Sequence, residues 1–218
     1  MMDETGREWF RGALGEAELA ALDASISTND GPGVRLTLSA LGIAADALAG
    51  IASRVAPTAR VVRVIAFDKH SEVNWSLGWH QDRVIAVQER AEVDGFSAWT
   101  RKAGVWHVEP PLEFLRSMFF LRVHLDDADA DNGALEIALG SQRAGRVRSE
   151  DAAAVAERGD CEVCVALRGD VLAASALLLH RSGVSRVSSP RRAIRVDYAT
   201  VPLPTPLEWA DASDMAVA

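Results

Sequence analysis

Cysteine is scarce in this sequence, which contains only Cys161 and Cys164. A structural zinc site needs four ligands, and the chain has no second cysteine pair to complete one. The two cysteines lie in an alternating apolar stretch, CEVCVAL, that predicts a β-strand, whereas a redox-active pair is usually found at the start of a helix. We therefore expect two buried, unreactive thiols and neither a zinc site nor a redox site.

Long hydrophobic runs and an excess of positive charge are also missing. No segment approaches the roughly 18 apolar residues that a membrane-spanning helix requires. The first residues, MMDETGREWF, lack the basic region and apolar core of a secretory signal. The formal net charge of -8 repels nucleic acid and anionic lipid. We expect a cytoplasmic protein that binds neither membranes nor nucleic acid, and the sequence predicts no oligomeric state.

The chain is nevertheless long and apolar enough to bury a core, with 218 residues of which 49% are hydrophobic. We expect a single domain over 1–218, with a helical preface at 1–55 and a β core at 60–201. Ala and Leu spaced three and four apart predict helices over 7–27 and 40–53.

Apolar and charged residues alternate from about residue 61 onward, as in VVRVIAF, which is the pattern of strands with one buried face. Further strands are predicted at 76–87, 116–126, 134–138, 161–167, 170–179 and 192–201. Many short strands after a helical preface favour a mainly β fold, either a sandwich or an eight-stranded jelly roll of the cupin kind. The polar, irregular segment 88–113 is expected to be a long insertion between strands, and long loops of this kind often act as lids.

The sequence WHQD at 79–82 contains the first candidate ligands. In an extended strand His80 and Asp82 project from the same face, while Gln81 points the other way. A single pair of this kind also fits a surface hydrogen bond. His180, which follows the apolar stretch VLAASALLL, supplies a second histidine, although it could simply cap a strand end. Two histidines and a carboxylate make a facial triad for iron(II) that leaves sites open for a bidentate oxoacid and dioxygen.

An arginine pair lies eleven residues beyond His180, in the segment SPRRAIRVDY. A guanidinium there can hold a carboxylate through two hydrogen bonds, as the distal carboxylate of 2-oxoglutarate requires when its ketoacid end chelates iron. Alternation along the strand directs Arg191 and Arg192 to opposite faces. It does not decide which of the two points inward.

Several motifs, taken together and in this order, resemble the phytanoyl-CoA dioxygenase family. They extend from about residue 60 to 200 and comprise FDKHSEVNWSLGWHQD, KAGVWHVEPP, LRVHLDDADADNGALEIALGS, the GDV strand, LLLHRSG and PRRAIRVDYA. The resemblance implies a double-stranded β-helix fold, iron(II), and the use of dioxygen to oxidise 2-oxoglutarate to succinate and carbon dioxide.

The resemblance also implies roles for individual residues. The family's catalytic metal ligands match His80, Asp82 and His180. Its cosubstrate-binding groups match Arg191 and Ser182, and family members often place further groups of this kind at the positions of Lys69 and Arg122, each of which could also be a solvated strand residue.

The expected activity is hydroxylation of a small metabolite or natural-product intermediate, with desaturation and ring closure as related outcomes. Candidate substrate contacts are Trp75, Trp106 and His107, although tryptophans often serve only packing and His107 could be an exposed loop residue. Two alternatives stay open. One is a non-catalytic jelly-roll binding module, and the other is a cupin-type metalloenzyme that does not use 2-oxoglutarate.

Overall fold

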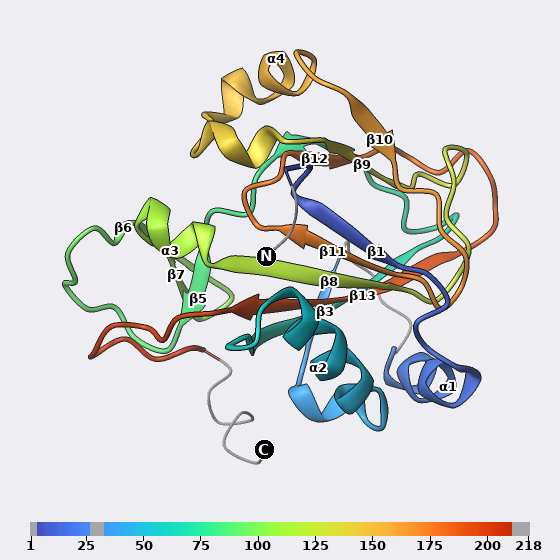
Figure 1. Ribbon diagram of the computed structural model, residues 1–218, viewed down its shortest axis with the longest axis horizontal. Coiled ribbons are helices and arrows are strands. Elements are labelled where there is room, and N and C mark those ends of the chain that lie inside the picture. The colour runs from blue at the N-terminus through green and yellow to red at the C-terminus, as the bar shows by residue number, and fades with distance from the viewer. Residues whose placement is uncertain (1–3, 27–32, 211–218) are drawn as a thin grey trace.

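The computed structural model describes residues 4–26 and 33–210, and the structural statements below concern these residues. Two antiparallel sheets form the body of the molecule (Figure 1). The six strands of the larger sheet lie in the order β1 (Arg7–Phe10), β11 (Val171–Ser175), β8 (Met118–His124), β13 (Arg191–Ala199), β3 (Arg60–Lys69) and β2 (Val34–Leu36). The smaller sheet has the order β10 (Cys161–Val163), β9 (Leu135–Ala138), β12 (His180–Ser182) and β4 (Leu77–His80).

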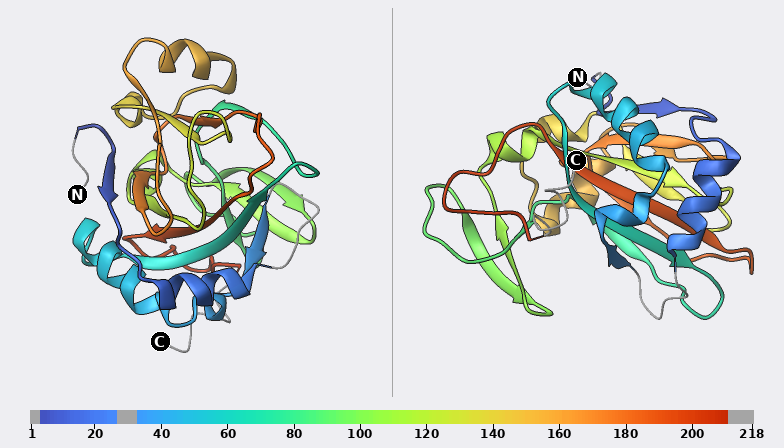
Figure 2. Two further views of the ribbon diagram at one scale, coloured as in Figure 1. Left: turned by 90° about the vertical axis from the view of Figure 1, so that its right-hand side faces the viewer. Right: turned by 90° about the horizontal axis from the view of Figure 1, so that it is seen from below.

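A third, three-stranded sheet lies to one side of these two (Figure 2). Its strands are β5 (Ile85–Val87), β7 (Val105–Glu109) and β6 (Ser97–Lys102), in that order. The α-helices are α1 (Glu16–Ser25), α2 (Ala44–Val55), α3 (Leu112–Arg116) and α4 (Ala152–Ala156), and short 3-10 helices are η1 (Leu38–Leu41), η2 (Ser141–Ala144) and η3 (Ser149–Asp151). No helix in the described ranges is both long enough and apolar enough to cross a bilayer.

Helices α1 and α2 cover the face of the six-stranded sheet that points away from the smaller sheet (Figures 1 and 2). Strand alternation builds the core between them, because Leu121 of β8 and Val196 of β13 pack with Leu22 and Leu48 of the helices. The next residues along each strand point to the opposite face, toward the smaller sheet. This inner face carries the polar side chains described below.

The predicted class, mainly β with N-terminal helices in a jelly roll, is confirmed, with two differences near the N-terminus. Residues 7–10 form strand β1 instead of the start of a helix, because they pair with β11 and extend the large sheet. The helix that follows covers Glu16–Ser25, and residue 27 of the predicted helix lies outside the described residues. The helix predicted at 40–53 is η1 followed by α2.

Two predicted strands and the predicted insertion also differ from the structure. The segment 76–87 is divided into β4 and β5, with an irregular turn at 81–84 that contains Asp82. The insertion at 88–113 is not irregular throughout, since β6 and β7 form a hairpin. Strand β10 is short, and Cys161 is exposed while Cys164 is buried, so the expectation of two buried thiols is wrong for Cys161.

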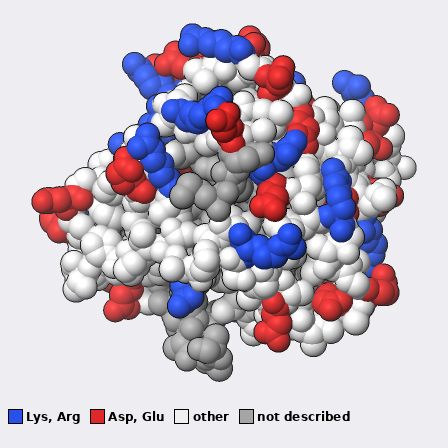
Figure 3. Space-filling model, in the orientation of Figure 1, with Lys and Arg blue, Asp and Glu red and all other residues white. Residues whose placement is uncertain are grey.

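Charged side chains are distributed without segregation on the face shown in Figure 3. Basic and acidic groups alternate across the described part of this face. Much of the charge is paired at short range, as in Arg181–Glu136 and Arg7–Glu162, each 2.8 Å or less between nitrogen and oxygen.

Candidate functional site

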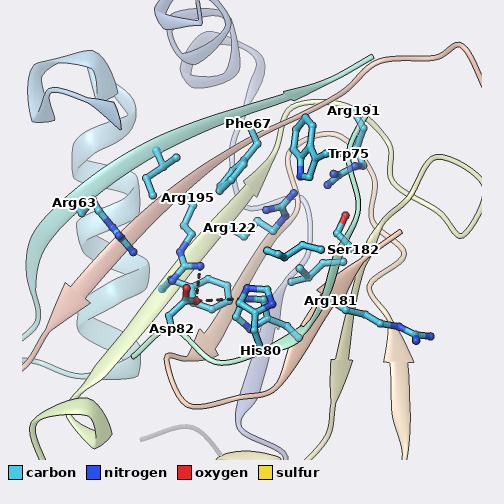
Figure 4. Close-up of a pocket in the computed structure, with 15 residues that line it drawn as sticks. Arg63, Phe67, Trp75, His80, Asp82, Arg122, Arg181, Ser182, Arg191 and Arg195 are labelled. Atoms are coloured by element: carbon cyan, nitrogen blue, oxygen red, sulfur yellow. Dashed lines mark ion pairs between the residues drawn. The ribbon is translucent and has the colours of Figure 1, made fainter. Parts of the chain in front are cut away.

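A cavity of about 240 Å³ lies between the two main sheets and contains most of the residues singled out from the sequence (Figure 4). Its walls come from strands β3, β4, β8, β12 and β13 and from the turn that follows β4. Alternation makes this possible, because every second residue of β3, β8 and β13 faces inward. The polar side chains gather at two ends of the cavity, with His80 and Asp82 at one end and Arg122, Ser182 and Arg191 at the other, and apolar side chains such as Phe67 and Phe120 also line it (Figure 4).

One end contains His80, Asp82 and His180, whose potential ligand atoms all lie within 4.8 Å of one another. The two histidines are direct partners in the pairing of β4 with β12, and their ring centroids are 4.2 Å apart. Asp82 follows in the turn, where its backbone N–H donates to the Ala176 carbonyl. Its Oδ2 atom is 3.2 Å from Nε2 of His180. Strand pairing thus brings His180 next to His80 and Asp82, which lie about a hundred residues earlier in the sequence.

Hydrogen bonds set the orientation of both imidazole rings. Nδ1 of His80 is 2.8 Å from the carbonyl oxygen of Gly78, and Nδ1 of His180 is 2.8 Å from that of Leu178. Because a carbonyl oxygen only accepts, each Nδ1 must carry the proton, which leaves each Nε2 as a free electron-pair donor. Burial lowers the pKa of His80, and the nearby His180 lowers it further. Both effects favour the neutral form that binds metal ions.

The Asp82 carboxylate remains ionised despite its surroundings. Burial alone would raise its pKa, but the charge of Arg195 and the contact with His180 hold the pKa well below the usual range. Two neutral imidazoles and one carboxylate are the donor set of non-haem iron(II) sites with open coordination positions. The residues present at this end of the cavity therefore fit an iron(II) ion.

At the other end of the cavity Arg122 and Arg191 line the wall, and a third buried cation, Lys69, contacts the lining residue Ser182. Nζ of Lys69 donates to Oγ of Ser182 at 3.1 Å and to the Gly183 carbonyl at 2.5 Å. Nε of Arg122 and Nε of Arg191 are buried without a hydrogen-bond partner. Within the described parts of the chain, no carboxylate forms an ion pair with any of the three. An anion placed here would complete their hydrogen bonding.

The proximity of these cations is visible in their pKa values. Burial, together with the charges of Arg191 and Arg122, lowers the pKa of Lys69 to about 7. Burial also lowers the pKa of Arg191 to about 10. For Arg122, burial comes first and Arg191 second as causes of a lowered pKa. All three shifts would be reversed by a negatively charged ligand.

The structure distinguishes the two arginines that the sequence left open. Arg191 lines the cavity and is 2% exposed. Arg192 points to the other side of β13, where its Nη2 is 2.8 Å from Asp126 and its Nη1 is 3.0 Å from Asp23. Arg191 is therefore the arginine that faces the cavity.

Of the three candidate substrate residues, only Trp75 lines this cavity. Its ring centroid is 4.9 Å from Nζ of Lys69. Trp106 and His107 lie on β7 in the side sheet, where Trp106 packs against Trp99 and His107 is within 3.1 Å of the Val105 carbonyl. Neither residue is among those that line the cavity, and their role in substrate binding stays a prediction.

Sequence reasoning missed three polar residues next to the candidate ligands. Nη1 of Arg195 is 2.7 Å from Oδ2 of Asp82, and its Nε donates to Asp197 at 2.6 Å. Arg63 in turn donates from Nε to the other oxygen of Asp197 at 2.5 Å. The signal was present in the alternation of β13, because residues 191, 195 and 197 share a face. The partner of Asp197, however, depends on the pairing of β13 with β3.

Comparisons with known proteins agree with this geometry. The sequence matches the family model described as Phytanoyl-CoA dioxygenase (PhyH) over residues 14–193. A search of curated protein sequences finds no match to this chain.

Three solved structures illustrate the shared fold. AviO1 from Streptomyces viridochromogenes Tue57 has 20% sequence identity and a TM-score of 0.63, with 94% of this chain and 93% of that chain covered. The epimerase SnoN, in complex with Fe3+, alpha ketoglutarate and nogalamycin RO, has 15% identity, a TM-score of 0.63 and coverage of 93% and 87%. HygX from Streptomyces hygroscopicus, with nickel and 2-oxoglutarate bound, has 17% identity, a TM-score of 0.57 and coverage of 94% and 84%.

Proposed function

Because the chain belongs to the phytanoyl-CoA dioxygenase family, we propose that it is an iron(II)- and 2-oxoglutarate-dependent dioxygenase that hydroxylates a small metabolite or natural-product intermediate. The observation that carries this proposal is the division of one cavity into two ends. A complete set of two imidazoles and one carboxylate lies at one end, and three buried cations without a carboxylate partner lie at the other.

The proposal assigns the metal ion to His80, Asp82 and His180. Nε2 of each histidine is the free donor, since Nδ1 is engaged with the backbone. Three ligands on one side leave three coordination positions for a bidentate ketoacid and dioxygen. When bound, iron(II) activates dioxygen, so that one oxygen atom enters the substrate C–H bond and the other oxidises 2-oxoglutarate to succinate and carbon dioxide.

The cationic end is assigned to the distal carboxylate of 2-oxoglutarate. Arg191 offers a planar pair of donors from the start of β13, and Lys69 and Arg122 add charge. Ser182, hydrogen-bonded to both Lys69 and the Gly133 carbonyl, is held at the same place. A dianion with its two acidic groups at opposite ends matches a cavity with a metal site at one end and cations at the other.

The remaining lining residues are mostly apolar, and the arginines among them, Arg63, Arg181 and Arg195, are already paired with carboxylates of the chain. Ile65, Phe67, Leu77 and Leu135 contribute apolar walls, and Leu77 is half exposed at the opening. SnoN, which shares the fold, is described in complex with the small molecule nogalamycin RO. These features support a small organic substrate that presents an unactivated C–H bond next to the metal.

Anaerobic titration of the metal-free protein with iron(II) and 2-oxoglutarate tests the proposal. We expect a weak visible charge-transfer band at one equivalent of each, and formation of succinate after air is admitted. His180→Ala should remove both signals. The matched control is His70→Ala, which replaces a histidine outside the cavity and should behave as the native chain does.

The two other functions make different predictions for the same titration. A binding module would show no metal stoichiometry. A cupin-type metalloenzyme without this cosubstrate would bind the metal but show no band and no succinate upon addition of 2-oxoglutarate. Either result would overturn the proposal.

A further inference from the structure

Asp82 is joined to a chain of charged groups, buried or half-buried, that runs along the wall of the cavity. The chain consists of Asp82, Arg195, Asp197 and Arg63, in that order (Figure 4 shows the contact between Arg195 and Asp82). Each contact is between opposite charges, at 2.7, 2.6 and 2.5 Å. Positive and negative charges alternate, and the formal charges of the four groups cancel.

Arg195 is the only member that contacts carboxylates on both sides. It uses two edges of its guanidinium, Nη1 for Asp82 and Nε for Asp197. The plane of the Arg195 guanidinium is further confined by the ring of Phe120, whose centroid is 4.0 Å from Cζ of Arg195. Because the guanidinium is rigid and planar, fixing one edge fixes the direction of the other. The position of Asp197 therefore determines where Arg195 places Nη1, whose contact with Oδ2 of Asp82 is an ion pair and not a hydrogen bond.

Asp197 itself has a fixed position. It lies on the central strand β13, opposite Arg63 in the register with β3, and its side chain is 4% exposed. Arg63 donates to the carboxylate oxygen that Arg195 does not use. Both oxygens of Asp197 are thus occupied, and the arginine pair is built into the most extensively paired strands of the large sheet.

Asp82, by contrast, lies in an irregular turn. Its backbone N–H is bound to the Ala176 carbonyl, but turn backbone alone does not set the rotamer of a carboxylate. Among the described residues, the basic side chains within 4 Å of its Oδ2 are those of Arg195 and His180. Arg195 therefore connects the rigid large sheet to the side chain of Asp82 in the turn.

We propose that Arg195 is a positioning residue for the metal centre, which transfers the rigidity of β13 and β3 to the Asp82 carboxylate. This inference rests on the proposed function, since it presupposes that Asp82 binds the metal. Asp197 already neutralises the charge of Arg195, so the role assigned here is geometric. A charge effect alone would have the opposite sign, because removing a cation near a divalent metal ion strengthens metal binding.

Cobalt(II) titration of the metal-free protein measures whether the loss of Arg195 weakens or strengthens metal binding. The visible bands of bound cobalt(II) also report its coordination geometry. Partners beyond the ligands themselves typically contribute ten- to a hundredfold to metal affinity. We expect Arg195→Met to weaken cobalt(II) binding by roughly that factor and to change the band pattern of the bound metal. Arg195→Lys, which keeps the charge but not the planar fork, should give a smaller loss in the same direction.

The matched control is Arg192→Met, which removes the neighbouring arginine of β13 from its ion pairs with Asp126 and Asp23. It should leave both affinity and spectrum unchanged. Asp197→Asn, which removes the charge that anchors Arg195, should weaken cobalt(II) binding by a few fold. This variant and Arg195→Lys keep the test decisive if Arg195→Met does not fold, as checked by circular dichroism.

Unchanged or tighter cobalt(II) binding in folded Arg195 and Asp197 variants would overturn the positioning role while leaving the proposed function intact. If the native chain binds no metal at all, the proposed function itself fails. The two failures are therefore distinguishable in one set of titrations.

Discussion

The two ends of the cavity balance their charges in different ways. At the metal end, the carboxylates of Asp82 and Asp197 alternate with two arginines, and the protein neutralises itself. At the cationic end, Lys69, Arg122 and Arg191 are buried without a carboxylate partner in the described residues. The first arrangement is complete within the chain, whereas the second is completed only by an anionic ligand. Buried charges without partners are costly, so a site of this kind indicates a ligand that supplies the missing charge.

Removing a ligand at the metal end should have the largest effect. We expect Asp82→Ala to weaken metal binding by roughly a few hundredfold, because a tetrahedral structural zinc site gains on the order of 3–4 kcal/mol for each of its four ligands. Calorimetric titration with nickel(II) measures this. Asp68→Ala, which removes a buried carboxylate of β3 that does not line the cavity, is the control and should bind nickel(II) normally. Normal binding by Asp82→Ala would exclude this residue as a ligand.

The stability of the ligand-free protein tests whether the two ends of the cavity differ in charge balance. Arg195→Met should lower the free energy of unfolding by about 3 kcal/mol, because it leaves two buried carboxylates without their shared partner. Arg191→Met should leave that free energy unchanged or raise it, since it removes a buried charge that has no partner. Urea denaturation without metal or 2-oxoglutarate measures both. Equal losses in the two variants would show that the two ends do not differ in charge balance.

Arg191→Met, which should not lower the stability of the free protein, should instead lower its affinity for 2-oxoglutarate. Loss of one partner from a buried, hydrogen-bonded charge pair costs about 2 kcal/mol or more, so Arg191→Met should weaken 2-oxoglutarate binding by roughly thirtyfold. Its affinity for the metal alone should remain native. The control is Arg192→Met, on the opposite face of the same strand, and titration of the nickel(II)-loaded protein gives both values. A native affinity for 2-oxoglutarate in Arg191→Met would refute the assignment.

The three candidate ligands at the metal end can be identified from short sequence patterns. His80 and Asp82 are two residues apart, and local spacing alone places them on one face. His180 becomes a candidate because an apolar strand ends beside it. The structure brings all three together through the pairing of β4 with β12. The metal end could therefore be anticipated from short sequence patterns.

Features that depend on pairing between distant strands could not be predicted. Arg192 is excluded from the cavity because its partners Asp23 and Asp126 come from other parts of the chain. The charge chain through Arg195 requires the register that places Arg63 opposite Asp197. Residues 7–10 become a strand for the same reason, since the edge of β11 offers them hydrogen bonds. Helical periodicity in the sequence contains no information about that edge.

The smallest expected effect is a pH dependence at the cationic end. In the free protein Lys69 has a pKa lowered to about 7, first by burial and then by Arg191 and Arg122, so above pH 7 it loses the proton that a bound carboxylate requires. We expect the affinity for 2-oxoglutarate to fall by up to about tenfold per pH unit from pH 7 to 9, with uptake of a proton on binding. The free energy of unfolding of the ligand-free protein should instead rise with pH between about pH 7 and 10, since in this range the unfolded chain binds the proton that folded Lys69 has lost. Calorimetry in buffers of different ionisation enthalpy measures the proton uptake, and Lys69→Met should bind 2-oxoglutarate more weakly but without this dependence. A native pH profile in Lys69→Met would assign the titration to another group and remove Lys69 from the cosubstrate site.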